Sequence, residues 1–163
     1  MSTIDAPGRA AAGRLPGPPP RLLVIQAPYY EQVVGGMRRG AEAVFAEVGA
    51  EVEVADVAGA FELPAALRMA LARPGARKTD GTLILGCVVR GETDHYDFIC
   101  DAVCHGVMAI GAETGAAIGF GLLTVDTLQQ AIARSGNDRM NKGAEAAHAL
   151  LGQVALRRRW GVE

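Results

Sequence analysis

The residues best suited to chemistry form one short stretch, residues 90–97, with the order Arg-Gly-Glu-Thr-Asp-His-Tyr-Asp. It follows an apolar run, 82–89, that is typical of a buried parallel strand, and it precedes an amphipathic pattern that predicts a helix. Ligands bind at the carboxyl ends of strands in open α/β sheets, and free N–H groups at a helix start attract anions. Because His95 can move protons near neutral pH, the stretch predicts a phosphate or other anion beside a proton-transfer group.

Two other turns carry polar and aromatic side chains directly after strand-like runs. Residues 27–30 include Tyr29, and residues 59–62 include Glu62. Because the carboxyl ends of parallel strands meet at one edge of a sheet, we expect both side chains to face the same crevice as the histidine. A ring that stacks, a carboxylate that accepts hydrogen bonds and a proton carrier together predict a site for a planar polar ligand.

The elements needed to position these residues alternate along the chain between strand and helix patterns. Strands are expected at 22–25, 52–57, 82–89 and 117–124, and helices at 30–48, 63–71, 96–113, about 127–134 and 142–159. This alternation predicts a parallel sheet covered by helices on both faces, with right-handed crossovers. Residues 1–20, rich in Ala, Gly and Pro, are expected to form a flexible arm, and residues 21–163 a single domain.

Composition narrows the class of protein. The 163 residues fit one domain, and the net charge of −2 does not favour nucleic acid or an anionic membrane surface as the main partner. Three cysteines without a disulfide spacing favour a reducing compartment. Neither a membrane span nor the apolar part of a signal peptide is recognisable, so we expect a cytoplasmic protein. The arginine run at 157–159 is expected to be a solvated helix end.

Other chemistry-bearing residues leave alternatives open. Arg134 could stabilise the end of a helix or bind phosphate with its guanidinium, and Lys142 stands across the helix break from it. His105 and His148 have no neighbours at metal-ligand spacing and are expected to be surface or packing residues. No zinc motif, P-loop, dinucleotide-binding fingerprint or nucleophile elbow follows a predicted strand. The patterns therefore predict no metal site.

Four ordered motifs resemble the 6,7-dimethyl-8-ribityllumazine synthase family. They are Gly-Ala-Phe-Glu-Leu-Pro at 59–64, the stretch at 86–97, Phe-Gly-Leu-Leu-Thr at 120–124, and Gln-Ala-Ile-Ala-Arg at 130–134 together with Asn-Lys-Gly at 141–143. The resemblance covers residues 21 to about 160, nearly everything except the arm.

The resemblance implies a fold and a reaction. The fold is a flavodoxin-like three-layer α/β/α sandwich with a four-stranded parallel sheet. The reaction condenses 5-amino-6-(D-ribitylamino)uracil with 3,4-dihydroxy-2-butanone 4-phosphate, with loss of phosphate and water. This is the penultimate step of riboflavin biosynthesis. It needs no metal and no redox cofactor.

The resemblance also implies roles for individual residues. In the family, an aromatic stacks on the heterocycle, a turn holds the ribityl chain and ring, a backbone edge reads the pyrimidine, and backbone donors approach the phosphate. Tyr29 matches the stacking aromatic, and Ala60, Phe61 and Glu62 match the turn that holds the ribityl chain and ring. Cys87, Val88 and Val89 match the segment whose backbone recognises the pyrimidine. Glu92 and Thr93 match the backbone donors near the phosphate.

Further matches imply an oligomer. His95 matches the proton-transfer residue, while Phe120 and Arg134 match an aromatic and a phosphate-binding arginine that a neighbouring subunit contributes. Lys142 is expected to support the phosphate site. A monomer would then lack half of the site, so we expect a homopentamer, a decamer of two pentamers or an icosahedral 60-mer.

The chain also departs from the family. Pro28-Tyr29-Tyr30 stands where many members have Arg-Phe-Asn, and Ala58 replaces a common proline. These changes motivate two rival hypotheses, a shell-forming protein with a weakened site and a flavin- or lumazine-binding module without catalysis. The archaeal type of riboflavin synthase is a third rival, which the identity of the product would distinguish.

Overall fold

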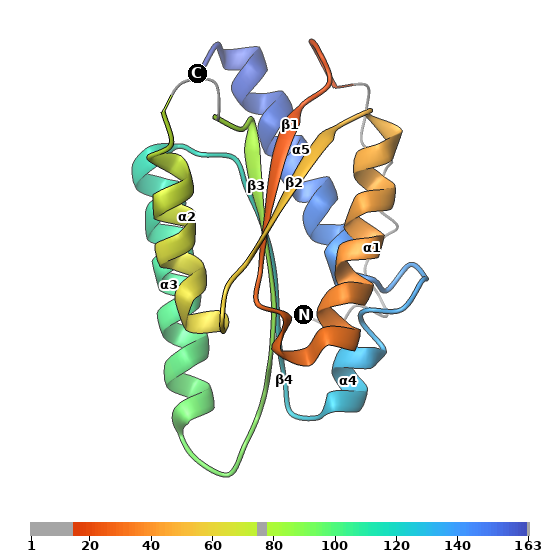
Figure 1. The fold of residues 1–163 in the computed structure, drawn as a ribbon, viewed down its shortest axis with the longest axis vertical. Helices are drawn as coiled ribbons and strands as arrows, with labels where there is room; N and C mark the ends of the chain where they lie inside the picture. The colour runs from red at the N-terminus through yellow and green to blue at the C-terminus, as the bar shows by residue number, and fades with distance from the viewer. Residues whose placement is uncertain (1–14, 75–77, 163) are drawn as a thin grey trace.

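The computed structural model describes residues 15–74 and 78–162. Four strands form one parallel sheet in the order β2-β1-β3-β4, as Figure 1 shows. They are β1 (Arg21–Gln26), β2 (Glu51–Asp56), β3 (Gly81–Val89) and β4 (Ile118–Val125). All four predicted strands are present, and each of their ends lies within one residue of its expected position.

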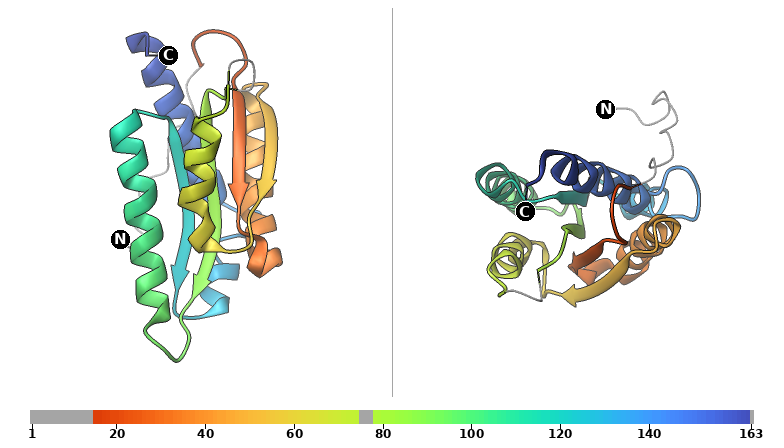
Figure 2. Two further views of the ribbon diagram at one scale, coloured as in Figure 1. Left: turned by 60° about the vertical axis from the view of Figure 1, so that its left-hand side comes forward. Right: turned by 90° about the horizontal axis from the view of Figure 1, so that it is seen from above.

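Helices cover both faces of this sheet. Figures 1 and 2 show α1 (Glu31–Glu47) and α5 (Lys142–Trp160) on one face and α2 (Leu63–Leu71) and α3 (His95–Thr114) on the other. The short helix α4 (Leu128–Ile132) lies near the carboxyl ends of the strands, on the side of α1. The predicted three-layer, flavodoxin-like α/β/α sandwich is therefore confirmed.

Two apolar clusters hold the layers together. Val24 and Leu85 belong to the cluster beneath α1 and α5, whereas Ile25 and Ile84 belong to the one beneath α2 and α3. The two middle strands supply both clusters because successive side chains of a strand point to opposite faces. β2 lies at an edge, and most of its residues are exposed.

Close backbone contacts join α1 to the segment that precedes and begins α5. A methyl group at Gly143 would lie 1.9 Å from the carbonyl oxygen of Met37, and one at Gly36 would lie 2.3 Å from that of Ser135. Real side chains do not tolerate such distances, so both positions require glycine for the two segments to approach this closely.

The turns near the site are more regular than the sequence predicted. Two of them form short 3₁₀ helices, η1 (Pro28–Tyr30) and η2 (Ala60–Glu62). Pro28 suits the first position of η1 because its fixed φ is compatible with a helical turn and its missing N–H is not needed there. The predicted helix at 127–134 ends earlier, at Ile132, and continues only as hydrogen-bonded turns.

Most of the expected N-terminal arm, residues 1–14, lies outside the described residues. Where the chain becomes described, Leu15 packs against the α1/α5 cluster. Nη1 of Arg158 donates to the carbonyl oxygens of Pro16 and Pro18, at 2.7 Å each, and Nη2 donates to Asp80 at 3.1 Å. Arg158 is therefore not a solvated helix end as predicted, because its side chain is mostly buried between these partners. The division into an arm and a single domain stays a prediction.

Candidate active site

Two exposed aromatic rings stand at the carboxyl ends of β1 and β2. Tyr29 in η1 is 78% exposed and Phe61 in η2 is 62% exposed. Both 3₁₀ helices contact β3, and η2 also contacts α3, so the two turns adjoin the histidine-bearing segment. These rings offer a surface on which a planar ligand can stack.

The turn that carries Phe61 also carries a carboxylate. Ala60 is partly buried against the α2/α3 cluster and Glu62 is exposed. Glu62 donates its backbone N–H to the carbonyl oxygen of Gly59 at 3.3 Å, and its carboxylate lies so near that a methyl group at Gly59 would be 3.2 Å from Oε2. The carboxylate therefore folds back over the turn, where it can accept hydrogen bonds from hydroxyl groups.

The last four residues of β3 have a strand on one side only. β3 pairs with β1 up to Leu85, whereas its pairing with β4 continues to Val89. In a parallel strand, the N–H and C=O groups of alternate residues point to the same side. Leu85 accepts from Ala27 on the β1 side, so Cys87 and Val89 turn their backbone groups to that side as well, and Val88 turns toward β4. This overhang leaves a backbone edge beside η1 that can read the edge of a ring.

Cys87 itself is no candidate nucleophile. Its side chain belongs to the apolar cluster beneath α1 and α5, and burial raises the pKa of its thiol to about 11. The thiolate is the reactive form of cysteine, so this residue is inert at neutral pH. Its contribution to the edge is confined to the backbone.

The loop after β3 leads into the start of α3. Glu92, Thr93 and His95 are all exposed there. Asp94 is the N-cap residue of α3 but makes no side-chain hydrogen bond to the first turn. N–H groups at a helix start without such a cap can bind an anion, and the positive end of the helix dipole favours it. This geometry agrees with an anion beside His95.

A second group of candidates lies on β4 and around the break between α4 and α5. Lys142 donates its backbone N–H to the carbonyl oxygen of Arg134 at 2.8 Å, so these two residues are neighbours. Phe120, Lys142 and Glu145 help to line a cavity of about 220 Å³ along β4 and the start of α5. Lys142 Nζ lies 2.6 Å from Glu145 Oε2, so a nearby carboxylate already balances its charge.

Arg134 differs from Lys142 in its partners. Its Nη1 donates to the carbonyl oxygen of Gln130 at 2.9 Å. Within residues 15–74 and 78–162, the guanidinium of Arg134 has no carboxylate in ion-pair distance. Four of its five N–H donors are therefore left for water or a ligand, which favours the phosphate-binding interpretation over a purely structural one.

A buried amide that the sequence analysis overlooked fixes this second group. Asn141 is 4% exposed, and its Nδ2 donates to the carbonyl oxygens of Gly36 (3.0 Å), Ser135 (3.3 Å) and Gly136 (2.7 Å). Its Oδ1 accepts from the N–H of Ala144 at 2.9 Å and caps α5. An asparagine directly before a helical pattern is a capping signal, so only half of this role was readable from the sequence.

The two groups of candidates do not meet through side chains in one subunit. Among the described residues, no side-chain hydrogen bond or ion pair joins Phe120, Arg134 or Lys142 to the aromatic, carboxylate and histidine group. In the sheet, β4 occupies the edge opposite to β2. In one copy of the chain, the two groups of candidates are therefore not joined by a direct side-chain contact among the described residues.

The described residues offer no further site of these kinds. No group of three or more His, Cys, Asp and Glu there could hold a metal ion. His105 is exposed and its Nδ1 lies 3.0 Å from Asp101 Oδ1, as expected for a surface residue, while His148 is half-buried. None of the described helices is both long and apolar enough to cross a membrane.

The parallel sheet with helices on both faces and an open carboxyl edge places the chain among α/β proteins of flavodoxin-like architecture. The family model for 6,7-dimethyl-8-ribityllumazine synthase matches residues 19–158. The chain therefore belongs to the 6,7-dimethyl-8-ribityllumazine synthase family.

Three relatives that carry this family name illustrate the match. The synthase of Leifsonia xyli is 39% identical over 160 residues, which cover 96% of this chain and 98% of the relative. That of Methylorubrum populi is 38% identical over 145 residues (88% and 86%). The protein of Caulobacter vibrioides named 6,7-dimethyl-8-ribityllumazine synthase 1 is 41% identical over 144 residues (86% and 92%).

Proposed function

We propose that the chain carries out its family's reaction at the carboxyl edge of the sheet. The reaction condenses 5-amino-6-(D-ribitylamino)uracil with 3,4-dihydroxy-2-butanone 4-phosphate to give 6,7-dimethyl-8-ribityllumazine, and it makes the chain a transferase of riboflavin biosynthesis. The observation that carries the site assignment is the backbone overhang of β3, which lies between exposed aromatic rings and an uncapped helix start.

The uracil substrate is assigned to the surface formed by η1, η2 and the β3 overhang. Tyr29 stacks on its ring, and the segment Cys87, Val88 and Val89 recognises its edge through the backbone groups of Cys87 and Val89, which turn to the open side. Ala60, Phe61 and Glu62 hold the ribityl chain. The exposure of both aromatic rings and the fold-back of the Glu62 carboxylate support this pose.

The phosphate of the second substrate is assigned to two sources of positive potential. Backbone N–H groups at Glu92 and Thr93 face it at the start of α3. Arg134, whose guanidinium has no carboxylate at ion-pair distance among the described residues, approaches from a neighbouring subunit together with Phe120. Lys142 supports this second source. An arginine binds phosphate through bidentate hydrogen bonds, which fix the orientation of the phosphate as well as balancing its charge.

The chemistry then needs proton transfer at several atoms. The primary amine of the uracil attacks the ketone, water leaves, and an imine forms. Removal of the proton on the adjacent carbon lets the electron pair expel phosphate from the next carbon. After tautomerisation, the ribitylamino nitrogen attacks the second carbonyl and water leaves as the ring closes. His95 moves protons in these steps, a role worth about 10²–10⁴-fold in rate, while holding both substrates together contributes further.

The separation of the two groups of candidates supports a homo-oligomer. One copy bears the aromatic, carboxylate and histidine group, and Phe120, Arg134 and Lys142 belong to a different part of the chain. A ring of copies would bring the second group of one subunit to the first group of the next. We propose a pentamer, alone, as a decamer or within a 60-mer, and native mass spectrometry distinguishes the three. The cytoplasmic location stays a prediction.

The test mixes purified protein with both substrates and follows the absorbance and fluorescence of the lumazine product. The variant His95→Gln should retain the fold and lose most of kcat, whereas His105→Gln, an exposed histidine on the same helix, is the matched control. Arg134→Gln should raise KM for the phosphorylated substrate with little change in KM for the uracil.

Each contrary result has a defined meaning. An assembled wild-type protein that binds the uracil but makes no product at saturating substrate supports the binding-module hypothesis. An assembled protein that neither binds nor turns over substrate supports the shell hypothesis. Full activity of His95→Gln removes this residue from the mechanism.

A further inference from the structure

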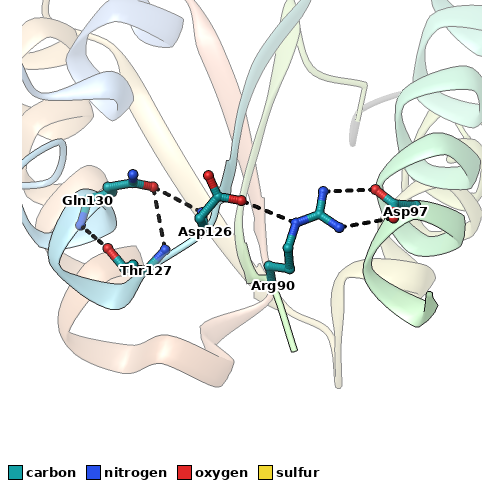
Figure 3. A network of polar contacts seen from close by, with 5 residues as sticks. All are labelled: Arg90, Asp97, Asp126, Thr127 and Gln130. Atoms are coloured by element: carbon teal, nitrogen blue, oxygen red, sulfur yellow. Dashed lines mark hydrogen bonds and ion pairs between the residues drawn. The ribbon is translucent and has the colours of Figure 1, made fainter. Parts of the chain in front are cut away.

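Arg90, the residue that follows β3, lies at the centre of a polar network between the two candidate groups (Figure 3). Its Nη1 and Nη2 each lie 3.0 Å from an oxygen of Asp97, and its Nε lies 3.1 Å from Asp126 Oδ1. Its guanidinium carbon stands 4.1 Å from the centroid of the Tyr96 ring. Partners from two segments, Tyr96 and Asp97 in α3 and Asp126 after β4, therefore fix one side chain.

The charges in this network exclude a direct role for Arg90 in holding phosphate. Two carboxylates surround one guanidinium, and the hydrogen bonds from Arg90 lower the pKa of Asp97 below its usual value. An anion placed against this group would meet a net negative surrounding. The basic residue of the motif is thus occupied within its own subunit.

The first branch of the network leads to the histidine turn. Asp97 lies two residues after His95, in the first turn of α3, so the paired hydrogen bonds tie that turn to the end of β3. A guanidinium–carboxylate pair with two parallel hydrogen bonds fixes orientation as well as distance. The start of α3, whose N-cap residue makes no side-chain capping bond, gains its anchor from this pair.

The second branch leads to α4. The backbone N–H groups of Asp126 and Thr127 donate to Gln130 Oε1 at 2.9 and 3.4 Å, and Gln130 N–H donates to Thr127 Oγ1 at 3.3 Å. This is a capping box at the start of α4 (Figure 3). The carbonyl oxygen of Gln130 accepts from Arg134, so contacts run from Arg90 to the phosphate-binding candidate.

We propose that Arg90 is a positioning residue that sets both the His95 turn and, through Asp126 and α4, the guanidinium of Arg134. The proposal rests on the proposed function. In the proposed oligomer, the two ends of this network serve two different active sites, because each subunit gives its histidine to one site and its arginine to the next. A disturbance at Arg90 therefore alters two neighbouring sites at once.

Three isosteric or near-isosteric variants separate the branches. Asp97→Asn should lower kcat with little change in KM, since it loosens the histidine turn. Asp126→Asn should raise KM for the phosphorylated substrate, since it loosens the link to Arg134. Arg90→Lys keeps the charge but loses the two-pronged geometry, and it should show both effects. Small misplacements of reacting groups cost up to about 10²-fold, so shifts of roughly tenfold or more are expected.

The matched control is Arg73→Lys. Arg73 makes an equally close two-pronged pair with Glu53, at 3.0 and 2.5 Å, after α2 and far along the chain from either branch. This variant should show wild-type kinetics. Assembly by native mass spectrometry and circular dichroism are measured for every variant.

The outcomes are distinguishable from those of the proposed function. A wild-type protein that makes no product refutes the function, whatever the variants do. An active wild type with unchanged kinetics in Arg90→Lys overturns the positioning role. The positioning role is also overturned if Asp97→Asn and Asp126→Asn lower kcat and raise KM to the same extent. A merely structural role would change both parameters in both variants.

Discussion

The amide of Asn141 provides the sharpest stability test of the segment that carries Arg134. The change Asn141→Asp keeps an acceptor for the N–H of Ala144 but replaces the donor Nδ2 with a second oxygen. That oxygen would face the carbonyl groups of Gly36, Ser135 and Gly136, now 2.7–3.3 Å from Nδ2. Asn141→Ala removes both the donor and the cap.

The magnitudes follow from the bonds lost. The cap on α5 is worth about 1 kcal/mol, and each buried carbonyl left without a donor costs about 1–3 kcal/mol. Nδ2 has two hydrogens for three acceptors, and other donors or water can satisfy some of them. We therefore expect Asn141→Ala to lower the free energy of unfolding by about 3 kcal/mol. Asn141→Asp should lose at least as much, although its capping oxygen remains.

Urea unfolding at fixed protein concentration measures this loss, because the stability of an oligomer depends on concentration. With slopes of about 1–3 kcal/mol/M, the midpoint should fall by roughly 1–3 M. The matched control is Asn137→Ala, an exposed asparagine of the same loop, which should leave the midpoint unchanged. Wild-type stability of Asn141→Asp would show that capping, rather than the three donated bonds, is what Asn141 contributes.

Two further predictions concern packing and burial. Gly143→Ala should destabilise the protein by at least about 1–3 kcal/mol, the usual cost of overpacking, because the new methyl group overlaps the carbonyl oxygen of Met37. Gly152→Ala is the control, because Gly152 has open space around it on the same helix. This variant should be neutral or stabilising in the same urea titration. Burial raises the pKa of the Cys87 thiol to about 11. Because the thiol of the unfolded chain ionises first, the stability that the protonated thiol contributes should be fully present below about pH 8.5. It should decline as the pH rises toward 11. Iodoacetamide at pH 8 should therefore leave Cys87 unmodified in the folded protein, and mass spectrometry that finds it rapidly alkylated would contradict its burial.

The sheet and its covering helices were readable from the sequence because their signals are local. Buried parallel strands are continuous apolar runs, and the helices between them show 3.6-residue spacing. The run at 82–89 and the helix end expected at Val48, before Gly49, each predicted a boundary within a residue of the observed one. The same locality explains why η1 and η2 were expected only as turns, since three residues carry no period.

The network partners could not be predicted in the same way. Arg90 pairs with Asp126 across 36 positions of sequence, and Asn141 binds Gly36 across 105. No periodicity links such residues, because only the folded sheet brings them together. The prediction for Arg158 was wrong for the same reason, because its partners Pro16 and Pro18 lie about 140 positions away in the sequence. The roles of the site residues came from a resemblance and stay predictions.

The overhang of β3 has a consequence for how such an edge can change during evolution. Main-chain groups would recognise a ligand that lies along Cys87 and Val89. Its recognition would therefore depend on the relative lengths of β1 and β3. Substitution at Val88 or Val89 changes a side chain but leaves every N–H and C=O in place. Insertion of one residue into β3 would instead turn the other set of backbone groups toward the ligand. Recognition along this edge should therefore tolerate sequence drift while being destroyed by a single insertion or deletion.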